Sequence, residues 1–160
     1  MTQNSTILMK YAINYLSKYS SSKGNLERML KNKVRRLKIE NKEKYLLYNS
    51  IEKIINDLEK NNFLNDYNYT SSKISLFFFQ GKSKIFIKNY FLQKGICKDI
   101  IDRVFIKFED DNTNWENQSA KIFAKKKNLL KYIDNKEKIL SKLARAGFSY
   151  EISKKILEDL

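Results

Sequence analysis

Apolar residues recur at spacings of three and four along almost the whole chain, a pattern typical of helices that bury one face. The first such stretch places six apolar residues on one helical face: Ile7, Leu8, Tyr11, Ala12, Tyr15 and Leu16. Ser5 precedes them as a candidate N-cap, and the polar run at residues 20–22 is expected to end the helix. The chain contains no proline, so no helix carries that breaker. We therefore predict an all-α fold.

The same spacing predicts two more helices in the first third of the chain. One carries Leu26 and Leu30 and is able to continue through Leu37. The next spans residues 51–58 and is expected to end at the pair of asparagines at 61–62.

A strand competes with a helix at residues 74–79, because Phe77, Phe78 and Phe79 form a short apolar run. A helix would place Ile74, Phe77 and Phe78 on one face. We favour the helix for this segment.

The chain contains internal repeats, which determine the predicted architecture. A shift of 52 residues aligns the last two thirds without gaps, pairing Ile87 with Ile139, Phe91 with Leu143, Gly95 with Gly147 and Ile100 with Ile152. A shift of 50 residues brings Ile54, Ile55 and Leu58 onto Val104, Phe105 and Phe108. We predict three tandem three-helix repeats, at residues 1–62, 63–112 and 113–160. Because a unit of about 50 residues buries little surface alone, the repeats should stack into an elongated, gently curved array.

Several residues indicate where the helices of these repeats begin and end. Gly95 and Gly147 suit the left-handed position after a helix, each followed by an apolar residue that packs back, Ile96 or Phe148. Four residues are expected to open helices: Ser83 and Ser149 as caps, and Asp134 with Glu137 as the capping pair of the third repeat's middle helix. Trp115 is expected to anchor the leading helix of the third repeat.

The charge balance indicates a polyanionic partner. Lysine and arginine total 32 against 18 acidic residues, a formal net charge of +14. Histidine is absent, which excludes serine–histidine and cysteine–histidine catalysis as well as histidine-bound zinc. The four glycines stand far apart, so no phosphate-binding loop is present. We expect no enzymatic activity and no cofactor.

The remaining composition concerns location and redox chemistry. The lone cysteine, Cys97, cannot form an internal disulfide, and its apolar neighbours favour a packing role. No apolar run is long enough to cross a membrane, and no leader pattern opens the chain. We expect a monomeric cytoplasmic protein without a membrane partner.

Basic residues gather in each predicted repeat, which would line cations into a track for phosphates. The candidate contacts are Arg35, Arg36, Lys82, Lys84, Lys88, Arg103, Lys125, Lys126, Lys127 and Arg145. Acidic residues at 109–111 with Glu116 form the sole candidate for a divalent metal site. A connecting loop explains these acids better, so we predict no metal.

Four segments, in the right order along the chain, resemble the RecX family of regulatory proteins. They are residues 124–127 with the later "LARAGFSY" stretch at 143–150, the "FLND" turn at 63–66, the "GKSK" and "QKGI" segments at 81–84 and 93–96, and Ala12, Tyr15 and Leu16 with "LERML" at 26–30. Two departures stand out: Asn62 replaces a glycine before the turn, and about ten extra residues lie around 35–48, which leaves the first middle helix undefined.

The resemblance implies three three-helix repeats and a modulator of the RecA recombinase. RecX proteins are thought to lie in the groove of the RecA–DNA filament and to lower filament extension, ATP hydrolysis, strand exchange and repressor co-cleavage. The expected partners are therefore the RecA filament and single-stranded, or also double-stranded, DNA. The alternative is a helical protein that binds single-stranded nucleic acid without sequence preference and independently of RecA. A metal-dependent nuclease built on the acidic residues is a third hypothesis.

Overall fold

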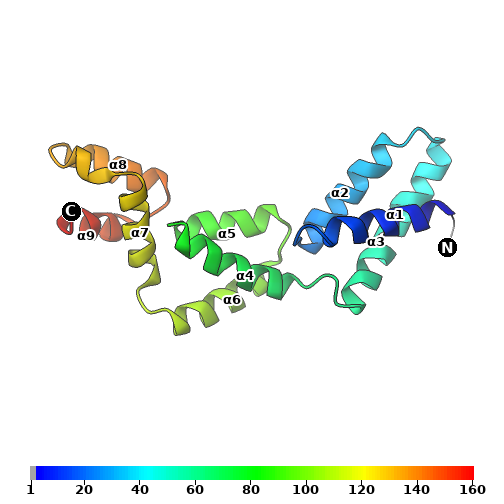
Figure 1. Cartoon of the computed structure of the whole chain (residues 1–160), viewed down its shortest axis with the longest axis horizontal. Helices are drawn as coiled ribbons and strands as arrows, with labels where there is room; N and C mark the ends of the chain where they lie inside the picture. The colour runs from blue at the N-terminus through cyan, green and yellow to red at the C-terminus, as the bar shows by residue number, and fades with distance from the viewer. Residues whose placement is uncertain (1–2) are drawn as a thin grey trace. The chain divides into compact units, whose positions relative to one another are not determined.

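The computed structural model describes the backbone of residues 3–160 and the side chains from residue 6 onward. Within that range every regular element is a helix, which confirms the all-α prediction (Figure 1). The helices are α1 (Gln3–Leu16), α2 (Lys23–Arg36), α3 (Asn41–Lys60), α4 (Asp66–Phe79), α5 (Lys84–Gln93), α6 (Lys98–Asp111), α7 (Trp115–Lys126), the 3-10 turn η1 (Leu129–Tyr132), α8 (Lys136–Arg145) and α9 (Tyr150–Glu158). Residues 74–79 are helical, as the face argument predicted. None of the described helices is both long and apolar enough to cross a bilayer.

The helices fall into two compact units. One comprises Met1–Tyr69 with Lys94–Ile96, and the other Thr70–Gln93 with Cys97–Leu160. The helix order is consistent with three successive sets of three helices, and the exact repeat boundaries stay a prediction.

The core of the first unit forms where α2 and α3 lie side by side and α1 packs across them (Figure 1). Its buried residues recur at helical spacing: Leu8 and Ala12 on α1, Leu26, Leu30 and Val34 on α2, and Leu47, Ile51, Ile54, Ile55 and Leu58 on α3. The extra residues of this repeat lengthen its last two helices, because α2 and α3 have 14 and 20 residues where α5 and α6 have 10 and 14. The middle helix that the sequence left undefined is thus α2.

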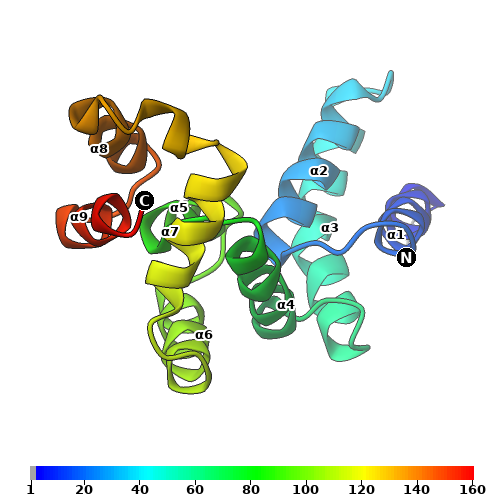
Figure 2. The same ribbon diagram turned by 60° about the vertical axis from the view of Figure 1, so that its left-hand side comes forward.

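In the second unit Phe77, Phe91, Phe105 and Phe108 are buried, and we take these apolar side chains as one group. Trp115 at the start of α7 packs edge-on against Phe108, as predicted for an anchor. The other group joins α7, α8 and α9, which Figure 2 shows clustered together, through Ala120, Ala124, Leu129, Ile139, Leu143, Phe148 and Ile156.

The predicted glycine turns are confirmed. Gly95 and Gly147 have positive φ values of 75° and 88°, and both Ile96 and Phe148 are buried behind them. At the second turn the Phe148 N–H donates to the carbonyl of Leu143, the closing bond of this helix ending. Asn62 has φ of 59°, so it does take the left-handed position that its place in the turn requires.

The predicted caps are confirmed at Ser83 and Ser149. Their hydroxyls accept the backbone N–H of the residue three positions later, Phe86 and Ile152 respectively. Asp134 is not a cap, because the Asn135 side chain instead accepts the Lys138 N–H at 3.0 Å. The cap is therefore the side-chain carbonyl of Asn135, one position later than the sequence predicted.

Two other local predictions were also wrong. The first helix begins at Gln3, two residues before Ser5. Cys97 is exposed and stands at the N-cap position of α6, so it is no packing residue. The residue just before it, Ile96, is the one that is buried.

Candidate nucleic-acid interface

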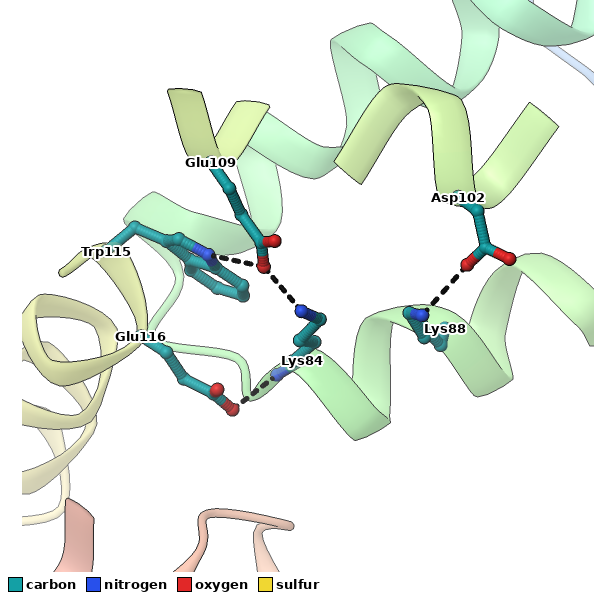
Figure 3. Close-up of polar contacts among 6 residues, drawn as sticks. All are labelled: Lys84, Lys88, Asp102, Glu109, Trp115 and Glu116. Carbon is teal, nitrogen blue, oxygen red and sulfur yellow. Dashed lines mark hydrogen bonds and ion pairs between the residues drawn. The ribbon is translucent and has the colours of Figure 1, made fainter. Parts of the chain in front are cut away.

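Two of the predicted phosphate contacts, Lys84 and Lys88, are engaged in holding helices together (Figure 3). The Lys84 ammonium lies 2.6 Å from Glu109 Oε1, which also accepts the Trp115 indole N–H at 3.3 Å. The backbone N–H of Lys84 donates to Glu116 Oε1 at 2.8 Å. Lys88 pairs with Asp102 at 2.9 Å. These contacts fasten α5 to α6 and to the start of α7. We call this set of contacts, centred on Lys84, a helix joint.

The pKa values of two acids at this joint are shifted in opposite directions. Desolvation raises the pKa of the half-buried Glu116 carboxyl, although the Lys84 N–H and the Lys84 charge oppose the rise. The Asp102 carboxyl, which is open to solvent, has its pKa lowered, chiefly by the hydrogen bond from Lys88.

The first unit contains the same joint. The Lys23 N–H donates to Asp66 at 2.8 Å and the Lys23 ammonium pairs with Glu59 at 2.8 Å. Desolvation raises the pKa of Asp66, as it does for Glu116. The correspondence means that a Ser–Lys pair at the start of a middle helix binds two acids that lie at the end of one helix and at the start of the next.

A serine hydroxyl adds one more bond to each joint. Ser22 Oγ donates to the carbonyl of Lys94, and Ser83 Oγ donates to the carbonyl of Ala146 at 2.6 Å. Both serines are fully buried. The joint was not predicted from the sequence, because the dipeptide Ser–Lys of positions 22–23 and 83–84 also occurs elsewhere in the chain and does not single these two positions out.

Two of the four acidic residues considered as a candidate metal site, Glu109 and Glu116, belong to this joint. Glu109 and Glu116 both bind Lys84, one through its ammonium and the other through its backbone N–H. Among the side chains described, no group of three or more ligand-type residues is arranged to hold a metal ion.

The cations of the third repeat are arranged differently. Lys127, at the C-cap of α7, and Arg145, at the end of α8, line one shallow hollow of about 340 Å³ together with Lys142, Phe123 and Ala146. This hollow brings together two predicted contact residues. It also adds Lys142, which was left out of the predicted set even though it lies three residues before Arg145 and shares its helix face.

Lys142 also belongs to a second group of cations around one aromatic ring. The ammonium groups of Lys131, Lys138 and Lys142 lie 5.0, 4.1 and 5.2 Å from the centre of the Tyr132 ring. A hydrogen bond from Lys131 and the charges of the three lysines lower the pKa of the Tyr132 hydroxyl. We call Lys127, Lys131, Lys138, Lys142 and Arg145 the C-terminal cation cluster.

Acidic partners are lacking in this cluster. None of its five cations forms an ion pair with a carboxylate among the described side chains. Elsewhere in the same repeat Lys121 pairs with Asp159 and Lys154 with Glu158. The cluster is therefore a local excess of positive charge, which is what an external polyanion would neutralise.

The other predicted contacts are spread over the surface. Arg35 and Arg36 are exposed in the last turn of α2, and Arg103 is exposed on α6. The half-buried Lys82 stacks its ammonium over the Phe86 ring at 4.5 Å. Lys126 donates to the Phe79 carbonyl at 3.1 Å.

Lys125 is the last of the predicted contacts. It is exposed and lines another hollow, beside Ala124, Leu129 and Ile156.

Comparison with known sequences finds relatives along nearly the whole chain, whereas no family model matches it. The chain is 29% identical to Regulatory protein RecX of Myxococcus xanthus over 96% of its own length and 85% of that protein. It is 40% identical to Regulatory protein RecX of Clostridium beijerinckii over 66% of the chain, and 34% identical to that of Streptococcus agalactiae over 69%. The latter two matches span 46% and 43% of those proteins, less than half of their length.

Solved structures of similar fold agree with these relatives. The crystal structure of RecX from Lactobacillus salivarius superposes with a TM-score of 0.71 at 27% identity, covering 100% of this chain and 98% of that one. Another crystal structure, of a regulatory protein RecX, gives a TM-score of 0.72 at 19% identity over 98% of this chain and 73% of that one, and it supports the fold alone.

Proposed function

Because this chain belongs to the RecX family, we propose that it is a regulator that binds the RecA–DNA filament and lowers the activity of RecA. In this proposal it hinders filament extension and reduces ATP hydrolysis, strand exchange and co-protease activity. It acts by binding, as a monomer, and catalyses no covalent step. Its relatives carry the name of regulatory proteins, which supports the regulatory part of the proposal.

The observation that carries the proposal is the C-terminal cation cluster. A nucleoprotein filament presents a dense row of phosphates, and cations without acidic partners bind phosphates without first breaking an ion pair. Five such cations gather around α8, η1 and the end of α7.

Within the predicted contact set, the local environments favour some members over others. We propose Arg35, Arg36, Lys125, Lys127 and Arg145 as contacts, with Lys142 added, and keep Arg103 as a candidate on its exposure alone. Lys84 and Lys88 would first have to leave Glu109 and Asp102. We therefore assign these two lysines to the joint.

The test is the single-stranded-DNA-dependent ATPase of RecA, measured as the protein is titrated in. Inhibition at or below one molecule per RecA monomer is expected, since a filament modulator acts on many subunits at once. Unchanged ATPase at equimolar protein would refute the proposal.

A charge variant makes this test specific. Lys127→Gln, Lys142→Gln and Arg145→Gln together should weaken the inhibition at least about tenfold, because each removes a cation that has no acidic partner. The matched control is Lys107→Gln, which removes one exposed positive charge from α6 in the same unit. If the triple variant and the control inhibit RecA equally, the C-terminal cation cluster is not required for the inhibition.

The alternative function is binding of single-stranded nucleic acid without any role for RecA. The lysines around Tyr132 favour it, because basic and aromatic side chains together suit unpaired nucleotides. The ATPase titration separates the two functions. A protein of the second kind would bind DNA with a steep salt dependence. At high salt it would therefore leave the ATPase of an assembled RecA filament unchanged.

A further inference from the structure

We propose that Tyr132 and the C-terminal cation cluster form a binding site for a single-stranded nucleotide segment, with an unpaired base on the Tyr132 ring and phosphates at the cations. This inference deepens the proposed function and rests on its nucleic-acid part. It assigns the cluster to nucleic acid and excludes it as a contact to an acidic protein surface.

The ring is held in place by the core of the repeat. Tyr132 ends the turn η1 and is half-buried against the apolar group of α7, α8 and α9, which includes Leu129, Ile139 and Leu143. Its ring thus has one supported side and a fixed orientation. A rigid aromatic surface of this kind is what base stacking requires.

Three lysines of the cluster lie against the ring, within reach of the phosphates of a nucleotide that stacks on it. Lys131, Lys138 and Lys142 lie within 5.2 Å of the ring centre, and Lys142 continues into the hollow shared with Lys127 and Arg145. Lys138, Lys142 and Arg145 follow spacings of four and three along α8, so they share one face of that helix. Ring and hollow are therefore parts of one continuous site.

In the unbound protein the lysines themselves occupy the neighbourhood of the ring. An exposed cation–π contact is weaker than the stacking of a base on an aromatic side chain, and the lysine stem is flexible. A nucleotide can thus displace the ammonium groups from the ring toward its own phosphates. Bringing like charges together around one ring is unfavourable, and binding a polyanion relieves that repulsion.

Tyr132 also distinguishes nucleic acid from an acidic protein partner. Carboxylates on a protein would be recognised by the cations alone and would need no supported ring between them. An aromatic ring flanked by cations matches the alternation of base and phosphate along a single strand. Paired bases are stacked inside a duplex, so the ring is expected to contribute to single strands and not to duplex DNA.

The experiment measures fluorescence anisotropy with two labelled probes, an oligothymidine of about 20 nucleotides and a duplex of about 20 base pairs, each longer than the site size of a typical single-strand binding fold. Tyr132→Leu keeps an apolar side chain against the core and removes the aromatic ring. It should lower the affinity for the single strand about tenfold or more and leave that for the duplex within about twofold, the effect expected when one base no longer stacks. Tyr132→Phe, which retains the ring, should restore the single-strand affinity. Thermal unfolding of each variant ensures that all are folded at the assay temperature.

The cation half of the site is tested by salt dependence. The triple variant at Lys127, Lys142 and Arg145 should lower the slope of log affinity against log salt by about 0.7 for each phosphate of the single strand that it no longer neutralises. Lys107→Gln, the matched control, should retain the wild-type slope because it lies outside the cluster.

Each outcome decides between the proposals. Loss of single-strand affinity in Tyr132→Leu with rescue by Tyr132→Phe supports the site, even if the wild-type protein leaves the RecA ATPase unchanged and the proposed function fails. Wild-type affinity of Tyr132→Leu for both probes overturns the site. So does a triple variant that binds DNA normally and yet no longer inhibits RecA, because the cluster would then face the RecA protein while the proposed function stands.

Discussion

Ser83 is expected to stabilise the protein more than an ordinary helix cap does, because it both caps α5 and bonds to the end of α8. Its buried hydroxyl accepts the Phe86 N–H at 3.2 Å and donates at 2.6 Å to the carbonyl of Ala146, a residue 63 positions away. Ser83→Ala removes both bonds. Loss of a cap costs about 1 kcal/mol, and loss of the second hydrogen bond, which leaves a partly buried carbonyl without its donor, costs about 1–3 kcal/mol more. We therefore expect Ser83→Ala to lower the free energy of unfolding by about 2–4 kcal/mol.

The assay is urea unfolding followed by far-ultraviolet circular dichroism, with Ser149→Ala as the matched control. Ser149 caps α9 through the Ile152 N–H at 3.3 Å, but it is exposed and makes no bond comparable to that between Ser83 and Ala146. Its replacement should cost about 1 kcal/mol. With a urea slope of roughly 2 kcal/mol per molar, Ser83→Ala should lower the unfolding midpoint by about 1–2 M and the control by about 0.5 M.

Ser22 holds the position in the first unit that Ser83 holds in the second. Ser22 is buried, accepts the Asn25 N–H at 3.2 Å and donates to the Lys94 carbonyl, so Ser22→Ala should cost as much as Ser83→Ala. If Ser83→Ala destabilises the protein no more than Ser149→Ala, the long-range bond contributes nothing and the reasoning about the joint is refuted.

Three further predictions concern single residues. Gly24→Ala should destabilise the protein by about 1–3 kcal/mol in urea unfolding, because its Cβ would lie 2.9 Å from the Gly95 Cα and 3.0 Å from the Lys94 carbonyl oxygen; a gain in stability, as alanine normally gives within a helix, would contradict this close approach. Burial raises the pKa of Glu116 above its ordinary 4.5, so the folded state binds this proton more readily and the contribution of the group to stability falls as pH rises from 4.5 through the raised pKa. Glu116→Gln should therefore flatten the dependence of unfolding free energy on pH over that range, and an unchanged slope would show that the burial has no such effect. Cys97 should react with a thiol reagent in the folded protein about as fast as in urea, since its side chain is exposed; strong protection in the native state would show that it is covered.

Local interactions explain how much of the fold was predictable. Helical periodicity depends on neighbours three and four residues apart, and that pattern alone predicted the all-α fold and the helix over residues 74–79. The endings at Gly95 and Gly147 were equally local, because glycine adopts positive φ there without strain. The cap at Asn135 was missed because two polar residues stand side by side, and only the backbone course decides which one reaches the N–H of Lys138.

The role of each lysine, in contrast, was decided by tertiary structure. In the sequence Lys84 and Lys127 look alike, since both lie in basic stretches that suit phosphates. In the folded chain Lys84 meets Glu109, which is 25 residues away, and becomes part of a helix joint. Lys127 instead lines a hollow with Lys142 and Arg145, where no acid lies. Whether a charge is neutralised or left for a partner depends on which distant side chains the helix packing brings within a few ångströms, and no local pattern contains that information.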